Sequence, residues 1–139
     1  MLENIGTVML IDDEEIDQKS YRRILNRTNS AEKIISFTYA EDALSFIKGN
    51  PNQKIDVVFL DINMPRMNGF EFLDAAIKDI GPEFARMVIV MLTTSMDPLD
   101  RKRAEENPLV RAFFNKPLTV AQINQTKELL EGLHDTDPA

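Results

Sequence analysis

The sequence predicts an α/β protein with a five-stranded parallel sheet in the order 2-1-3-4-5 and helices on both faces. Short apolar runs alternate with helical patterns five times along the chain, which is typical of a parallel sheet covered on both sides. The runs at 7–11, 57–60 and 87–92 are almost entirely apolar, as expected for strands buried on both faces. The length of 139 residues suits one domain, and 2-1-3-4-5 is a common doubly wound order.

The first half of the chain predicts three strands and two helices. We expect these elements, in chain order, at about 7–11, 14–27, 34–37, 40–48 and 55–60. The first helix begins with two acids, which suit the positive end of the helix dipole, and it carries Tyr21, Ile24 and Leu25 on one apolar stripe. The second helix ends at Gly49 and Pro51, which commonly follow a helix.

The second half predicts a helix, a strand, a helix, a strand and a last helix. We expect the first four at about 69–80, 87–92, 98–107 and 110–115. Gly81-Pro82 is interpreted as the end of the first of these helices. Thr119 and Gln122 form a capping box for the last helix. A polar tail is expected over 134–139.

The helix expected at 98–107 differs from the others. Leu99 and Ala104 are nearly its only apolar residues. A helix with so little apolar surface is weakly held, so it is expected to move or to dock a partner. The alternative is an ordinary solvated surface helix.

Composition excludes several kinds of chemistry. The chain has no cysteine and a single histidine, His134, so disulfides, the usual zinc sites and a Ser-His-Asp triad are not expected. The chain is acidic, with a net charge of -7, and so lacks the excess of basic residues that is typical of a nucleic-acid binder. No signal peptide and no apolar stretch of the ~18–20 residues of a membrane span is evident, so the expected location is cytoplasmic.

Polar residues stand at the carboxyl ends of four predicted strands. Asp12 and Asp13 follow the first strand, Asp61 the third, Thr93 the fourth and Lys116 the fifth. In an open parallel sheet these ends share the edge that binds ligands, and the order 2-1-3-4-5 places the first and third strands side by side. We therefore expect these residues in one pocket.

The residue types indicate the chemistry of this pocket. Three neighbouring carboxylates repel one another and resist ionisation unless a cation is present. A hard divalent cation, Mg²⁺ (or Mn²⁺), binds carboxylates, waters and phosphate oxygens. With a hydroxyl and an ammonium for a phosphoryl group, the pocket predicts phosphoryl transfer onto an aspartate, and Asp61 is the expected reacting group.

Each residue also has a simpler interpretation. An aspartate after a strand is often a helix cap, Lys116-Pro117 alone is a turn, and Thr93-Thr94-Ser95 alone is a cluster of capping residues. The joint arrangement favours a site, because four of the five predicted strands end on a chemically matched residue. Asn68-Gly69 keeps the simpler interpretation of a turn and a helix start.

These motifs resemble the receiver domain of bacterial two-component response regulators. The resemblance rests on Asp12-Asp13, Asp61 with Met64-Pro65, Asn68-Gly69, Thr93 and Lys116-Pro117, which occur in the family's order. It covers about residues 6–133, so the chain, 1–139, is expected to be a single receiver domain. Residues 92–95 followed by Asp97-Pro98 are similar to a group of stand-alone receivers without an output domain.

The resemblance implies that Asp61 accepts a phosphoryl group from a phosphohistidine on a sensor histidine kinase or a histidine phosphotransfer protein. Asp13 and Asp61 would bind Mg²⁺ (or Mn²⁺) by their side chains, Asn63 by its backbone carbonyl and Asp12 largely through water. The chain would catalyse only its own phosphorylation and dephosphorylation.

The resemblance also implies a switch. Thr93 and Lys116 would bind the new phosphoryl group, and Phe113 would follow Thr93 inward. The peptide bond before Pro117 would be cis, which costs only about 0.5–1 kcal/mol before proline. The surface of the helix at 98–107, the strand at 110–115 and the last helix would then change and signal to a downstream protein.

Three further residues flank the implied site where the family tunes hydrolysis. Thr94 stands where the family usually has Ala, Gly or Ser, and its branched side chain would narrow the approach to Asp61. Asn63 and Ser95 offer no strong acid or base to align water. No membrane or direct nucleic-acid contact is expected, and the expected state is a monomer or a weak dimer.

Two other functions fit the same fold. One is an interaction module that is never phosphorylated, for which the usual sign is loss of Asp61, Lys116 or one of the paired acids; none is lost here. The other is a metal-dependent aspartyl-phosphate phosphatase. That class typically carries a general acid two residues after the nucleophile, and here this position is Asn63, which cannot serve.

Overall fold

Five parallel strands form one sheet in the order β2-β1-β3-β4-β5 in the computed structural model, which describes residues 3–135. The strands are β1 (Thr7–Ile11), β2 (Lys33–Phe37), β3 (Val57–Leu60), β4 (Val88–Thr93) and β5 (Val110–Asn115). The predicted fold class and strand order are confirmed.

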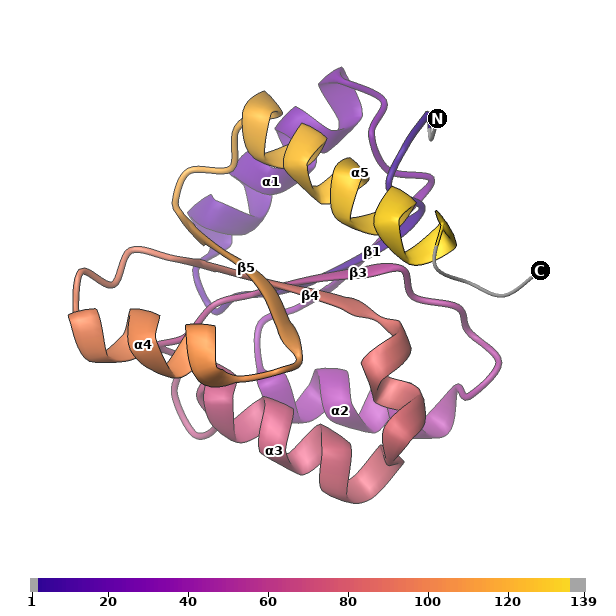
Figure 1. Ribbon diagram of the computed structural model, residues 1–139. Coiled ribbons are helices and arrows are strands. Elements are labelled where there is room, and N and C mark those ends of the chain that lie inside the picture. The colour runs from indigo at the N-terminus through magenta and orange to yellow at the C-terminus, as the bar shows by residue number, and fades with distance from the viewer. Residues whose placement is uncertain (1–2, 136–139) are drawn as a thin grey trace.

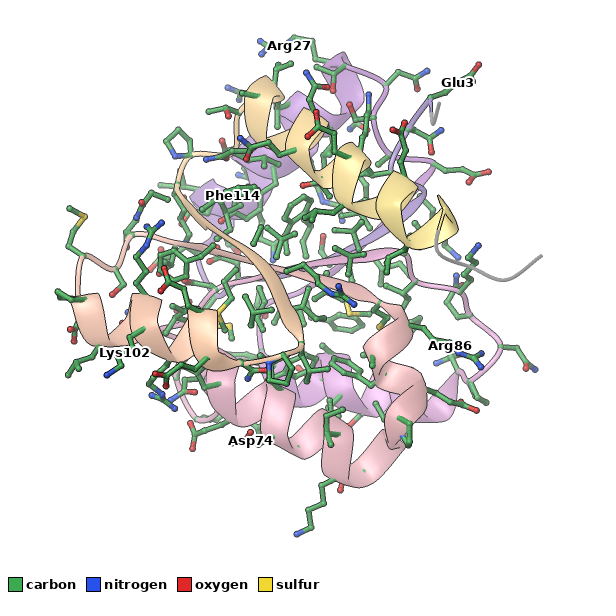
Figure 2. The ribbon with its side chains drawn as sticks, viewed as in Figure 1. Glu3, Arg27, Asp74, Arg86, Lys102 and Phe114 are labelled. Atoms are coloured by element: carbon green, nitrogen blue, oxygen red, sulfur yellow. The ribbon has the colours of Figure 1, made fainter. Side chains whose placement is uncertain are left out.

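Helices cover both faces of the sheet (Figure 1). The helices α1 (Glu15–Arg27) and α5 (Val120–Asp135) lie on one face, and α2 (Ala40–Gly49), α3 (Gly69–Ile80) and α4 (Pro98–Glu106) lie on the other. Side chains fill both spaces between helices and sheet (Figure 2). Successive side chains of β5 point to opposite faces of the sheet: Phe113 packs on the α4 side and Phe114 on the α5 side.

The two central strands, β3 and β4, are buried at every position. This explains their uninterrupted apolar sequences, because each strand contributes side chains to both cores. Burying a Leu or Phe side chain contributes about 1.5–3 kcal/mol, so these strands form a rigid centre. The residues that follow them are held in place at the carboxyl edge.

Most boundaries agree with the sequence predictions to within one residue, and three features differ more. Strand β3 begins at Val57, two residues after the predicted start, and α5 continues to Asp135, into the predicted tail. Gly81-Pro82 does end α3, but a short helix, η1 (Pro82–Arg86), follows it. This helix was not predicted; it is anchored by Phe84, which is fully buried and lies edge-on to Phe72 with ring centres 5.8 Å apart.

The helix α4 has the sparse apolar contact that its sequence indicates. Ala104 is its only buried residue, and Leu99 is 66% exposed. Two arginines stack on aromatic rings instead: Arg103 lies 4.1 Å from the ring centre of Phe70, and Arg101 lies 5.4 Å from that of Phe113. Such contacts contribute about 0.5–1 kcal/mol each at exposed sites, so two cation–π contacts help to hold α4 against α3 and β5.

No helix within residues 3–135 is long and apolar enough to cross a membrane.

Candidate functional site

The carboxyl edge of the sheet brings three acids together. Asp12 and Asp61 follow β1 and β3, whose last residues Ile11 and Leu60 are paired in the ladder. Asp12, Asp13 and Asp61 each offer one carboxylate oxygen, and these oxygens lie within 4.8 Å of one another. Asp12 is 1% exposed and Asp61 is 6% exposed. The pairing of β1 with β3 therefore creates the acidic pocket.

Lys116 reaches this pocket from the end of β5. Its Nζ lies 2.8 Å from Asp12 Oδ2, 2.8 Å from Asp17 Oδ2 and 3.3 Å from Asp61 Oδ2. Burial alone would lower the pKa of Lys116, but its bonds to Asp12 and Asp17 and the charge of Asp61 raise that pKa above the usual value. The ammonium therefore stays charged and balances the acids around it.

The carboxyl group of Asp61 ionises less readily than an ordinary aspartate, because its pKa is raised. Burial, together with the charge of Asp12, raises its pKa to about 6, although Lys116 and the N–H of Ile62 act in the opposite direction. That N–H donates to Asp61 Oδ1 at 2.8 Å. Near neutral pH the carboxylate is ionised but poorly solvated, which suits a nucleophile.

The acidic cluster fits a hard divalent cation. Carboxylate oxygens are the ligands preferred by Mg²⁺, which binds them at about 2.0–2.1 Å, and the three oxygens within 4.8 Å of one another need only small movements to share one ion. Mn²⁺ accepts the same ligands. Asp12, Asp13 and Asp61 are therefore the side chains that would hold the metal, while the role of the Asn63 carbonyl stays a prediction.

Thr93 and Lys116 lie next to each other through the backbone. The N–H of Lys116 donates to the carbonyl oxygen of Thr93 at 2.9 Å. Thr93 is fully buried, and its Oγ1 accepts the N–H of Ser95 at 3.1 Å. The hydroxyl keeps its own hydrogen available for another acceptor. The bond between Lys116 and Pro117 is cis, as the resemblance implies.

The remaining predicted residues surround this centre. Asn63 and Thr94 are exposed. Ser95 donates through Oγ to Asp100 Oδ2 at 2.6 Å, which ties the loop after β4 to the first turn of α4. Phe113 is half-buried on the α4 side of the sheet, next to Arg101.

Sequence reasoning missed two polar contributors from α1. Asp17 pairs with Lys116, and Tyr21 donates its hydroxyl to Asp12 Oδ2 at 2.6 Å. Burial and the neighbouring Asp12 raise the pKa of Tyr21, so its hydroxyl stays protonated as a donor. A signal was present, because Asp17 and Tyr21 are four residues apart and therefore share one face of the predicted helix. Tyr21 was interpreted only as core.

Gly69 is also closer to the site than its sequence interpretation suggested. A Cβ at this position would lie 2.5 Å from the carbonyl oxygen of Asp61 and 3.2 Å from the Cα of Ile62. The capping box of Asn68 with Glu71 starts α3, as expected for a helix start. The glycine additionally lets α3 begin directly against the backbone of Asp61.

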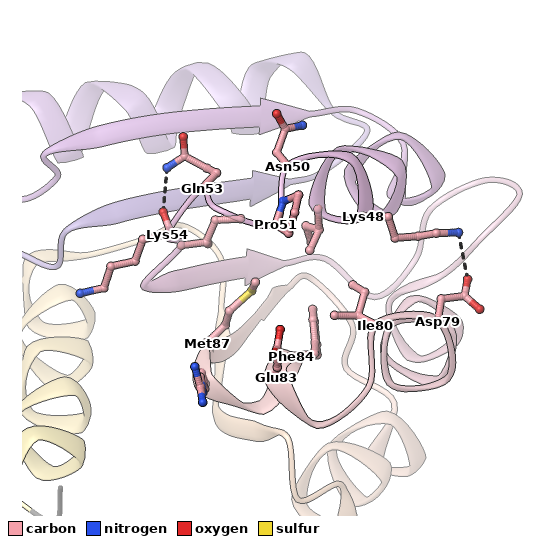
Figure 3. A pocket seen from close by; sticks show the side chains of 13 residues that line it. Lys48, Asn50, Pro51, Gln53, Lys54, Asp79, Ile80, Glu83, Phe84 and Met87 are labelled. Atoms are coloured by element: carbon pink, nitrogen blue, oxygen red, sulfur yellow. Dashed lines mark hydrogen bonds and ion pairs between the residues drawn. The ribbon is translucent and has the colours of Figure 1, made fainter.

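A hollow at the opposite, amino end of the sheet contains none of the predicted site residues (Figure 3). It lies between the end of α2 and η1, and the buried Ile55 and Phe84 are among the residues that line it. Lys48 on its rim pairs with Asp79 at 3.5 Å. The reactive groups thus gather at the carboxyl edge.

The sheet is parallel and doubly wound, and its carboxyl edge holds a buried acidic cluster and a lysine. This arrangement suits proteins in which an aspartate is the reacting group. The profile of the response regulator receiver domain matches residues 8–128, so the chain belongs to this family. The resemblance stated from the sequence is confirmed. Receiver domains are phosphoacceptor domains of two-component systems, phosphorylated by histidine kinases or phosphotransfer proteins, and bind Mg²⁺ at an acidic pocket.

Curated relatives agree with this assignment. The chain is 30% identical over 124 residues to a response regulatory protein of Vibrio parahaemolyticus, covering 89% of this chain and 47% of that protein. It is 32% identical over 96 residues to the response regulator UvrY of Escherichia coli K12, covering 68% of this chain and 41% of UvrY. The chain thus spans less than half the length of these relatives.

Solved structures show the same architecture. A two-component response regulator from Cytophaga hutchinsonii matches with a TM-score of 0.87 and 28% identity, over 93% of this chain and 98% of that one. The Mn²⁺-bound form of the response regulator Rcp1 matches with a TM-score of 0.69 and 20% identity, over 96% and 99% of the two chains, which shows the shared fold.

Proposed function

We propose that this protein is a phosphorylation-driven switch in which Asp61 accepts a phosphoryl group from a phosphohistidine. The observation that carries the proposal is the position of Asp61: a buried carboxylate at the end of β3, clustered with Asp12 and Asp13 and in contact with Lys116. Membership of the receiver family supports the same reaction.

In the proposed step a carboxylate oxygen of Asp61 attacks the phosphorus of the phosphohistidine. The new P–O bond forms as the P–N bond breaks, and the leaving imidazole takes up a proton. Asp12, Asp13, Asp61 and the carbonyl of Asn63 would hold Mg²⁺, which would supply positive charge for the phosphoryl oxygens. The product is an acyl phosphate on Asp61.

Thr93 and Lys116 are the residues that would bind the phosphoryl group once it is on Asp61. Phosphorylation adds about -1.5 to -2 charges and three acceptor oxygens. The free hydrogen of the Thr93 hydroxyl and the ammonium of Lys116 are the donors at the neighbouring strand ends. Movement of Thr93 toward the phosphoryl group draws Phe113 inward and releases the Arg101 that stacks on it. The surface of α4, β5 and α5 then differs between the two states.

The phosphodonor is a histidine kinase or a histidine phosphotransfer protein, and it docks over the pocket. Large apolar side chains are exposed at the same edge, among them Ile16 in the first turn of α1, which is 80% exposed, and Val120 at the start of α5, which is 48% exposed. Exposed apolar groups beside a reactive centre suit a protein partner. The reaction is proposed to take place in the cytoplasm, with the receiver acting as a monomer or a weak dimer.

The downstream partner is a protein that contacts α4, β5 and α5.

Phosphorylation must also supply enough free energy for the switch. Shifting a two-state equilibrium from 1:99 to 99:1 requires about 5.5 kcal/mol of differential interaction. Charge-assisted bonds contribute about 1.5–3 kcal/mol each, so new bonds from Thr93 and Lys116, together with the metal, are of the size that such a shift requires.

Beryllofluoride, a phosphoryl mimic, tests this proposal. With Mg²⁺ it should shift NMR signals of the wild type around Asp61, Thr93 and Phe113 and in α4. Asp61→Asn keeps the size of the side chain but removes the oxygen that binds the mimic, so its spectrum should not respond. An equal response in both proteins would remove Asp61 from the role of phosphoacceptor, and no response in the wild type would favour an interaction module that is never phosphorylated.

A further inference from the structure

Lys116 is held more closely by two other acids than by the proposed phosphoacceptor. Its Nζ lies 2.8 Å from both Asp12 and Asp17, but 3.3 Å from Asp61. Asp17 belongs to α1 and is not among the acids that cluster for a metal. Its side chain is 31% exposed, whereas that of Lys116 is 7% exposed. Asp17 therefore contacts the lysine from the solvent side of the pocket.

The helix that carries Asp17 is fixed to the sheet at this point. The next residue, Gln18, is buried, and its Nε2 donates to the carbonyl oxygens of Asp12 and Phe37, each at 3.0 Å. One turn later Tyr21 donates to Asp12 Oδ2 at 2.6 Å. These bonds leave little freedom for the first two turns of α1. The carboxylate of Asp17 is thus a fixed anchor for the lysine.

We infer that Asp17 is a positioning residue that holds Lys116 toward α1 in the unphosphorylated state and competes with the phosphoryl group for it. The inference rests on the proposed function. Lys116 must exchange its contact with Asp17 for one with the phosphoryl oxygens, and the Asp17 carboxylate repels those oxygens. Both effects favour the unphosphorylated state, so Asp17 sets how far a given phosphodonor drives the switch.

The same contact has the opposite effect on a cation. Asp17 shares the lysine with Asp12 and Asp61, and it adds one negative charge beside the pocket. Without Asp17, Lys116 would rest on the two metal-binding acids alone and compete more strongly with Mg²⁺. Loss of Asp17 should therefore weaken Mg²⁺ binding and strengthen binding of a phosphoryl mimic, a pair of changes that a purely structural role would not produce.

The variant Asp17→Asn tests this inference, because it removes the charge and keeps the side-chain size. Calorimetry should give a Mg²⁺ affinity that is lower by about two- to fivefold, and a beryllofluoride affinity at saturating Mg²⁺ that is higher by about two- to fivefold, as expected for one partly exposed ion pair. Glu15→Gln is the matched control. It removes an exposed acid from the same turn of α1 that makes none of the three ion pairs of Lys116, so both affinities should stay close to those of the wild type.

The outcomes separate this inference from the proposed function. If the wild type does not bind beryllofluoride, the proposed function fails. If the wild type binds it and Asp17→Asn matches either the wild type or Glu15→Gln in both affinities, the positioning role is overturned. In the wild type itself, the carboxyl carbon signal of Asp17 should shift when beryllofluoride binds, because Lys116 leaves it; an unmoved signal would also contradict the role, whether or not the variant folds.

Discussion

The Asp61 carboxylate combines two properties that rarely coexist: it is buried, and it faces other acids. Folding costs free energy when such a group is ionised, and the raised pKa of about 6 expresses that cost. Neighbouring groups offset part of this cost. Lys116 forms ion pairs with three acids, and the Tyr21 hydroxyl donates to the same Asp12 oxygen that Lys116 contacts. A phosphoryl group or a metal therefore enters a pocket whose charges are already arranged.

Asp61 should make stability depend on pH between about 4 and 6 in the absence of metal. Its folded pKa of about 6 lies above the ordinary 3.8, so its contribution is fully present below about pH 4 and is lost as the pH rises through 6. Asp61→Asn removes this loss. We expect the variant to be more stable than the wild type by about 1–3 kcal/mol at pH 7 and nearly equal to it at pH 4.

Urea unfolding of both proteins at the two pH values, with EDTA present, measures this difference. A wild type that gains stability relative to Asp61→Asn as the pH rises from 4 to 7 would contradict the raised pKa.

Gly69→Ala should damage the site without removing any polar group. The added Cβ would meet the carbonyl oxygen of Asp61 at 2.5 Å, and backbone atoms cannot yield cheaply. We expect a loss of about 1–3 kcal/mol of stability, as for overpacking, and a weaker response to beryllofluoride. Ala at Gly132, where a Cβ meets nothing within 4 Å, is the control. Equal effects at both glycines would show that the close approach to Asp61 is unimportant.

At the scale of elements, α4 is attached differently from its neighbour α3. The helix α3 buries five residues, whereas α4 buries Ala104 alone and relies on Arg101 and Arg103 over aromatic rings. One of these rings, Phe113, is the side chain that the switch is proposed to move. The helix thus buries little apolar surface, and the hydrogen bond from Ser95 to Asp100 connects it to the loop that follows Thr93.

Hydrogen exchange should reveal this weak hold. Amides in α4 should exchange about tenfold or more faster than those in the middle of α3, which corresponds to a difference of about 1.4 kcal/mol in opening free energy. Arg103→Ala should widen the gap by removing the stack on Phe70. Equal protection of α3 and α4 in the wild type would mean that α4 is no more mobile than the rest.

Much of the element order could be predicted because local patterns and the fold agree. Strands β3 and β4 have apolar sequences because they are buried on both faces. As predicted, Asp61, directly after β3, and Thr93, the last residue of β4, lie at the carboxyl edge. The short helix η1 was missed because Gly81-Pro82 is equally a stop signal and a start. Asp17 was missed because its partner, Lys116, lies 99 residues away in the sequence.

At the scale of the whole molecule, the proposed phosphorylation site lies at one end of the sheet, and the surface proposed to change lies along one side of it. The central strands fix the acids, the cluster around Lys116 balances them, and α4 with β5 lies where a change at Thr93 and Phe113 can be transmitted (Figure 1). The chain spans less than half the length of the curated relatives it matches. The contact of α4, β5 and α5 with a downstream protein is therefore proposed from this chain's own surface.

The most direct test of the central proposal is the intact mass of the protein after incubation with acetyl phosphate and Mg²⁺. The wild type should gain the mass of one phosphoryl group, and peptide mapping after borohydride reduction should place it at Asp61. Asp61→Asn should gain nothing. An unmodified wild type, or a phosphoryl group that persists in Asp61→Asn, would contradict the assignment of Asp61 as the phosphoacceptor.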